Sequence, residues 1–183
     1  MRFLKRFSTS LTLLAKRQKI DVPNSADDCL KSLALCLKLM PSVYKIKKAS
    51  FESKLDRMFH FVKQNASIVE AVKGKDAVHH KQPYLIVLGS FEHPLFFNLV
   101  VDQTVIPLGP DCRRAFNILF ASFWIFRLEY PTYLDKFFLF FEQFVYQVFL
   151  GEDCYTISSS NQDFANVLDD IASKNMSGAV GDV

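Results

Sequence analysis

The stretch Pro83-Tyr84-Leu85-Ile86-Val87-Leu88-Gly89 decides the fold of this chain. It is a short apolar run of strand-forming residues, bounded by a proline and a glycine, and this pattern predicts a buried strand. Residues 96–101 form a second such run, and residues 104–106 a third that stops at Pro107. Asp102 and Gln103 lie between them as a two-residue hairpin turn that lacks the preferred glycine. We therefore predict a three-stranded antiparallel meander.

Two phenylalanine-rich helices are predicted after the strands. Asp111 is a good N-terminal cap for the first, and residues 115–126 are apolar almost all round, which is typical of a central helix that ends at Tyr130-Pro131. Thr132 caps the second helix, which Gly151 ends. Ten of the 19 phenylalanines lie in residues 116–149, where Lys and Arg are sparse, so the excess indicates core packing rather than a nucleic-acid stacking surface.

Two helices are predicted before the strands. In the first, Leu30, Leu33 and Leu37 recur at helical spacing until Pro41. Ser50 caps the second, whose apolar stripe runs through residues 51–69 before Gly74 ends it. The predicted fold is thus α+β: a three-stranded antiparallel meander packed against two Phe-rich C-terminal helices, with two helices preceding the sheet.

Charge divides the chain unevenly. The formal net charge is +3, but residues 1–50 carry 11 Lys and Arg against 3 Asp and Glu, while residues 151–183 are acidic and polar. We therefore expect a basic N-terminal arm at residues 1–24, a single α+β domain at 25–151, and an acidic, mostly flexible tail at 152–183.

The basic residues provide one alternative function, the binding of nucleic acid or an anionic membrane surface through phosphate contacts. The candidate contact residues are Arg2, Lys5, Arg6, Lys16, Arg17, Lys19, Lys45, Lys47 and Lys48.

Residues 1–20 are basic, rich in hydroxyl groups and free of acids, a composition typical of a mitochondrial transit peptide. We expect an intracellular protein with reduced cysteines, either imported into mitochondria or cytoplasmic or nuclear. The apolar stretches are shorter than the roughly 20 residues of a membrane-spanning helix, so no transmembrane segment is predicted.

Catalytic and cofactor motifs are missing. The chain has no Walker A loop, no G-x-G-x-x-G, no H-E-x-x-H and no G-x-S-x-G. His79, His80 and His93 flank the first strand and could converge near Cys112, but their spacing does not demand a zinc site. Cys112 begins a helix, yet an ordinary buried thiol is the favoured interpretation over a nucleophile. The sequence predicts no catalytic residue, no metal and no cofactor.

A metal-dependent nuclease is the remaining enzymatic alternative, with Asp102 and Glu129 among its acids. The order of three strands and a helix invites comparison with ribonuclease-H-like nucleases, whose first strand carries a metal-binding Asp. Residues 83–89 contain no acid, so the comparison fails at the residues that two-metal catalysis needs.

A series of structural motifs extends over residues 82–150: QPYLIVLG at 82–89, FFNLVVD at 96–102, AFNILF at 115–120, LEYP at 128–131 and FLFFEQFVY at 138–146. The series resembles the C-terminal domain of uncharacterised multi-copy animal proteins, and the resemblance implies descent from mobile elements. It brings no catalytic residues with it. Phe120-Ala121 departs from the Phe-Lys pair common in that family.

A strong predicted core without a catalytic constellation favours a non-enzymatic protein-interaction or assembly module, with a protein partner or a second copy of the chain as its ligand.

Overall fold

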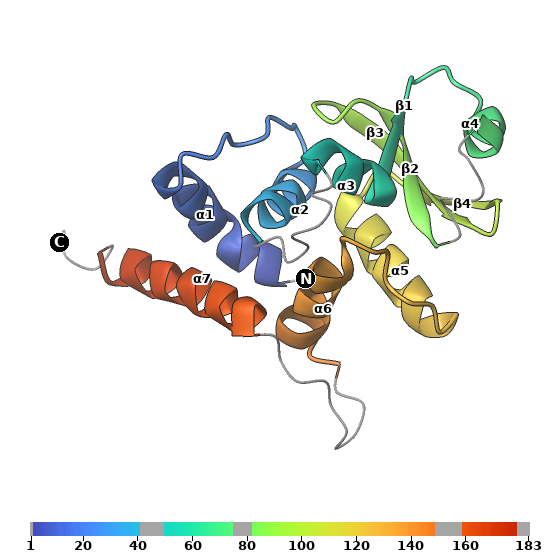
Figure 1. Ribbon diagram of the computed structural model, residues 1–183. Helices are drawn as coiled ribbons and strands as arrows, with labels where there is room; N and C mark the ends of the chain where they lie inside the picture. Colours follow the sequence, from blue (N-terminus) through green and yellow to red (C-terminus); the bar gives the residue numbers. More distant parts are fainter. Residues whose placement is uncertain (1, 41–49, 75–81, 149–158, 179–183) are drawn as a thin grey trace.

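A four-stranded mixed sheet with strand order β1-β2-β3-β4 lies at one end of the protein (Figure 1). The computed structural model describes residues 2–40, 50–74, 82–148 and 159–178. The strands β2 (Tyr84–Gly89), β3 (Pro94–Val101) and β4 (Thr104–Gly109) form the predicted antiparallel meander. Asp102 and Gln103 make the tight turn between β3 and β4, both with positive φ.

The strand β1 (Phe59–Val62) shows that the prediction of three strands was wrong. The predicted helix over residues 51–69 divides into α3 (Phe51–Met58), β1 and α4 (Ile68–Gly74). β1 pairs in parallel with β2. Its Phe-His-Phe-Val sequence suits a strand, and the backbone groups of β2 supply a non-local hydrogen-bonding partner that outweighs the helical spacing.

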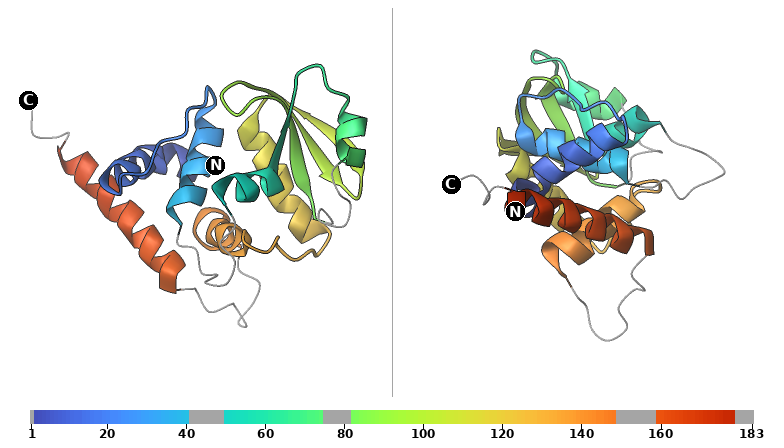
Figure 2. Two further views of the ribbon diagram at one scale, coloured as in Figure 1. Left: turned by 45° about the horizontal axis from the view of Figure 1, so that its top comes forward. Right: turned by 90° about the vertical axis from the view of Figure 1, so that its left-hand side faces the viewer.

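β2 is buried on both faces, which explains its unbroken apolar sequence. Leu85 and Val87 point into the main core, whereas Tyr84 and Ile86 belong to a smaller cluster on the opposite face. Val72 of α4 joins that smaller cluster. Figure 2 shows α4 and α5 on opposite sides of the sheet.

The helix α5 (Cys112–Ile125) lies on the sheet and contacts β2, β3 and β4. The side chain of Asp111 accepts a hydrogen bond from the Arg114 N–H at 3.1 Å, which confirms the predicted cap. The helix α2 (Asp28–Leu39) contacts both α3 and α5. Three helices therefore precede the first strand, α1 included, rather than the predicted two.

The second Phe-rich segment comprises α6 (Asp135–Phe140) and the π-helix η1 (Phe141–Tyr146). Its rings pack against those of α5, with Phe116 5.0 Å from Phe141 and Phe123 4.9 Å from Phe138 between ring centroids. The predicted packing of two Phe-rich helices against the sheet is thus confirmed in part, since this segment packs through α5. Core packing does account for most of these rings; the buried ones are Phe116, Phe120, Phe123, Phe137, Phe138, Phe140 and Phe141.

The two ends of the described chain pack together. The helix α1 (Arg2–Arg17) contacts both α2 and α7 (Ser159–Gly178) (Figures 1 and 2). Residues of the expected arm and tail therefore contribute to the same core as residues 25–151. Their buried apolar side chains are Phe7, Leu11, Leu14, Ala15, Phe164, Ala165, Leu168, Ile171 and Ala172.

Candidate functional site

An open pocket of about 730 Å³ lies at the C-terminal end of α5. α5, the connection that follows it, and the α6–η1 segment supply its walls. Its volume falls within the range of about 300–1,000 Å³ that is typical of ligand sites. The lining residues are Phe123, Trp124, Arg127, Leu128, Glu129, Tyr130, Asp135, Leu139 and Glu142.

The pocket forms because α5 ends at Ile125, before the predicted end at Tyr130-Pro131. Arg127 adopts the left-handed conformation with φ of 51°, which turns the chain away from the helix axis. The Leu128 N–H donates to the Phe123 carbonyl at 2.8 Å and closes this turn. The connection then leads to α6, whose N-cap is Leu134; the prediction that Thr132 caps this helix was wrong.

Three side chains form a hydrogen-bonded chain along the pocket. The indole Nε1–H of Trp124 donates to the Tyr130 hydroxyl at 3.1 Å. That hydroxyl donates to Oε2 of Glu142 at 2.7 Å. Glu142 is only 5% exposed, and its burial raises the pKa of the carboxyl, an effect that the Tyr130 hydrogen bond partly offsets. The protein thus holds a carboxylate in a site that disfavours its charge.

Glu142 lies in the π-helical segment η1. A π-helix is rare, and where it occurs it is frequently at a functional site. Here the segment ends at Gln147, which is left-handed with φ of 50° and donates its backbone N–H to the Glu142 carbonyl. A π-helical turn is wider than an α-helical turn, so side chains in η1 leave the positions that α-helical spacing predicts. The direction of the Glu142 side chain therefore cannot be read from helical periodicity in the sequence.

Two large apolar side chains are exposed at the same end of α5, although neither lines the pocket. Ile125 is 73% exposed and Phe126 is 51% exposed, at the last turn of α5. The prediction of a helix buried on every side is therefore wrong for this turn. Neighbouring apolar side chains that are exposed in this way are typical of an interaction surface.

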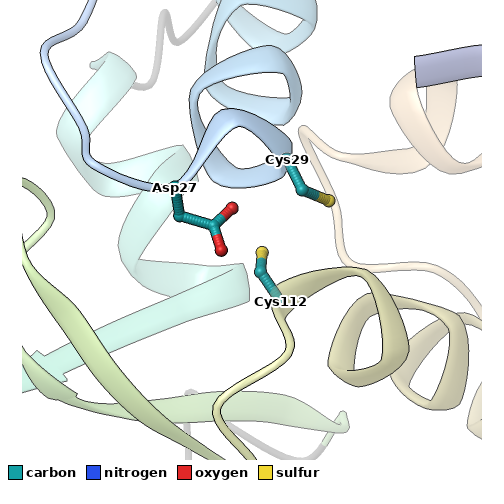
Figure 3. Close-up of side chains that lie close together, drawn as sticks. All are labelled: Asp27, Cys29 and Cys112. Carbon is teal, nitrogen blue, oxygen red and sulfur yellow. The ribbon is translucent and has the colours of Figure 1, made fainter. Parts of the chain in front are cut away.

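A second group of side chains lies where α2 and α5 begin. One ligand-type atom each of Asp27, Cys29 and Cys112 lies within 4.8 Å of the other two (Figure 3). The interaction with Cys29 and burial together raise the pKa of the Cys112 thiol well above its usual value, and Asp27 and Asp111 add to this. The favoured interpretation of Cys112 as a buried thiol is consistent with its 1% exposure.

The other residues singled out from the sequence are dispersed. Asp102 is exposed in the β3–β4 turn, whereas Glu129 lines the pocket. His93 is exposed in the β2–β3 loop, and His79 and His80 lie outside the described residues. Within the described ranges, Asp27, Cys29 and Cys112 are the only group of three potential metal ligands, and none of these histidines or acids joins it.

The basic residues of the expected arm divide into three sets. Lys16, Arg17 and Lys19 are exposed at and beyond the end of α1. Arg2, Lys5 and Arg6 lie on the α1 backbone, but their side chains are outside the described set, as are Lys45, Lys47 and Lys48 altogether.

The chain matches no protein-family model, no curated protein and no solved structure among those compared. In the described part of the chain, no helix is both long enough and apolar enough to span a bilayer. The resemblance of residues 82–150 to multi-copy animal proteins stays a prediction.

Proposed function

We propose that this chain is a protein-interaction module whose pocket at the end of α5 binds a cationic side chain within an apolar segment of a partner protein. The observation that carries the proposal is the buried Glu142, whose carboxylate lines an aromatic pocket at the end of α5, where Ile125 and Phe126 are also exposed.

The charges of the pocket favour a cation. Three carboxylates line it, from Glu129, Asp135 and Glu142, against the single guanidinium of Arg127. Trp124 adds an aromatic ring, and aromatic faces attract Lys and Arg by about 0.5–2 kcal/mol. A Lys or Arg side chain that enters the pocket would therefore gain an ion pair and ring contacts together.

The exposed apolar side chains at the end of α5 favour a protein segment over a small organic cation. A small cation would occupy the pocket and leave Ile125 and Phe126 in water. A peptide with apolar residues beside its Lys or Arg would cover both side chains, and each large apolar side chain removed from water contributes about 1.5–3 kcal/mol. The described lining contains no Ser, Cys or His, so nothing there offers a nucleophile with its base.

Trp124 makes the proposal directly testable, because it is the single tryptophan of the chain and lines the pocket. Two synthetic peptides of equal length and identical apolar residues, one with Lys and one with Glu at the polar positions, are titrated while Trp124 emission is recorded. We expect saturable binding of the Lys peptide at least about tenfold tighter than that of the Glu peptide, equivalent to about 1.4 kcal/mol. N-acetyl-lysine amide, which lacks apolar neighbours, should bind far more weakly.

A pair of matched variants locates the binding surface. Phe126→Ser should weaken the Lys peptide, whereas Val69→Ser on α4, where the side chain is similarly exposed at 56%, should not. Equal affinity for the two peptides, or equal loss in the two variants, would rule the proposal out.

A further inference from the structure

The side chains of Asp27, Cys29 and Cys112 come from the starts of two helices and lie close together (Figure 3). Asp27 caps α2, Cys29 lies in the first turn of α2, and Cys112 is the first residue of α5. Two sulfur atoms and a carboxylate oxygen thus lie within 4.8 Å of one another.

The backbone that carries Asp27 is held in place by contacts of its own. The Ser25 hydroxyl donates to the Phe91 carbonyl at 2.7 Å, and the Ala26 N–H donates to the Glu92 carbonyl at 2.8 Å. Oδ1 of Asp27 accepts the Leu30 N–H at 2.8 Å. These hydrogen bonds tie the start of α2 to the β2–β3 loop, so the position of Asp27 does not depend on the thiols.

The start of α5 is equally well defined, since Asp111 caps it and Cys112 is 1% exposed. Both thiols therefore sit on rigid elements at the N-terminal ends of helices, where the helix dipole favours a negative charge.

We propose that Asp27, Cys29 and Cys112 bind one Zn²⁺ ion, with a fourth position open to water or to a ligand from outside the chain. Thiolates with a carboxylate suit Zn²⁺, because Zn²⁺ accepts sulfur at about 2.3 Å and oxygen at about 2.0–2.2 Å in tetrahedral sites. Calcium and magnesium require oxygen ligands throughout and are disfavoured here.

Binding releases one proton from each thiol: the two Cys–SH groups and Zn²⁺ give a zinc dithiolate and two H⁺, while Asp27 enters as the carboxylate. The positive ion offsets the burial and the neighbouring carboxylates that oppose thiolate formation in its absence. The site joins α2 to α5, so Zn²⁺ should stabilise the packing of these two helices on the sheet.

Cobalt(II) tests the site, because thiolate-bound Co²⁺ has a sulfur-to-metal charge-transfer absorption that Co²⁺ in water lacks. The full chain is used, reduced with a phosphine, with Cys154→Ser in every sample to remove a thiol outside the described residues. We expect the absorption to saturate at one Co²⁺ per chain, Zn²⁺ to displace it, and metal binding to raise the melting temperature.

The variants identify the ligands. Loss of a group that only supports a ligand costs about 10–100-fold in metal affinity, so Cys29→Ser and Cys112→Ser should each weaken binding by at least about tenfold and reduce the absorption. Asp27→Asn keeps the helix cap, since Asn caps as well as Asp, and should retain the thiolate absorption with weaker affinity. Cys36→Ala, which removes a buried thiol elsewhere on α2, should bind like the parent.

No charge-transfer absorption at stoichiometric Co²⁺, or unchanged affinity in Cys29→Ser and Cys112→Ser, would overturn the proposal. Unchanged affinity in Asp27→Asn would overturn the three-ligand site. Circular dichroism of each variant separates loss of metal from loss of fold.

Discussion

At the scale of single residues, Glu142 is a buried acid whose charge costs stability, and the proposed function depends on it. The residue is 5% exposed, and its carboxylate accepts a hydrogen bond from the Tyr130 hydroxyl. Burial raises its pKa above the usual value of 4.5. An acid whose pKa is higher in the folded state contributes stability below its unfolded pKa, and that contribution is lost as the pH rises through the folded pKa. The ionised form of such a residue lowers the free energy of unfolding at neutral pH.

Glu142→Gln should therefore stabilise the protein at pH 7 and have a smaller effect at pH 4. Glutamine keeps an oxygen that accepts the Tyr130 hydroxyl but cannot ionise. Urea unfolding of both proteins at the two pH values measures the difference. A gain that is equal at pH 7 and pH 4 would show that ionisation of Glu142 is not the cause.

Gln103 occupies a backbone conformation that favours glycine. Asp102 and Gln103 have φ of 45° and 63° in the β3–β4 turn. Left-handed backbone costs a residue with a side chain roughly 1–2 kcal/mol, while glycine loses about 0.5–1 kcal/mol of entropy on folding. Gln103→Gly should therefore stabilise the protein by about 0.5 kcal/mol in urea unfolding. Thr104→Gly in the adjacent strand is the matched control and should destabilise it; equal loss in both would contradict the turn assignment.

At the scale of elements, local sequence patterns explain which strands were predicted correctly, and a non-local pairing explains which strand was missed. The meander of β2, β3 and β4 was predictable because each strand is apolar and bounded by turn residues. β1 was not, because residues 59–62 fit a helical stripe as well as a strand, and only pairing with β2 decides between them. In the pocket, Glu142 was not predictable from the sequence, since the π-helix and the contact with Tyr130 leave no periodic signal.

The helix α1 is an element whose role the charge pattern did not show. Leu11 of α1 is fully buried against the core that includes α2 and α7. Leu11→Ala should destabilise the protein by about 2–5 kcal/mol, the range for a buried leucine that leaves a cavity. Lys16→Ala on the exposed face is the control. Thermal or urea unfolding measures both, and a loss below about 0.5 kcal/mol for Leu11→Ala would mean that α1 does not pack as described.

At the scale of the whole molecule, one core connects the ends of the described chain. Buried residues from α1, α2, the sheet, α5, α6 and α7 belong to a single cluster, with a small separate one under α4. A continuous core of this kind should unfold cooperatively. Trp124 emission, which reports on α5, and far-ultraviolet circular dichroism, which reports on all helices, should therefore share one urea midpoint. Two separate midpoints would indicate that the α1–α7 pair unfolds as a unit of its own.

The placement of the pocket follows from this architecture. α5 is anchored on the sheet and packed against the α6–η1 rings, so its last turn, with Ile125 and Phe126 exposed, is held in place. A turn held in this way would lower the entropy lost if a partner segment binds as proposed.

The most direct test of the central claim is the affinity of the Lys peptide for the wild type and for Glu142→Gln, measured from Trp124 emission between pH 4 and pH 8. Glu142 shares the pocket with Arg127, Glu129, Tyr130 and Asp135, all present in both proteins. We predict about tenfold weaker binding in Glu142→Gln at pH 8, equivalent to about 1.4 kcal/mol. The wild-type affinity should rise with pH more steeply than that of the variant. Equal affinities across the whole pH range would contradict the proposal that the Glu142 carboxylate binds the cation.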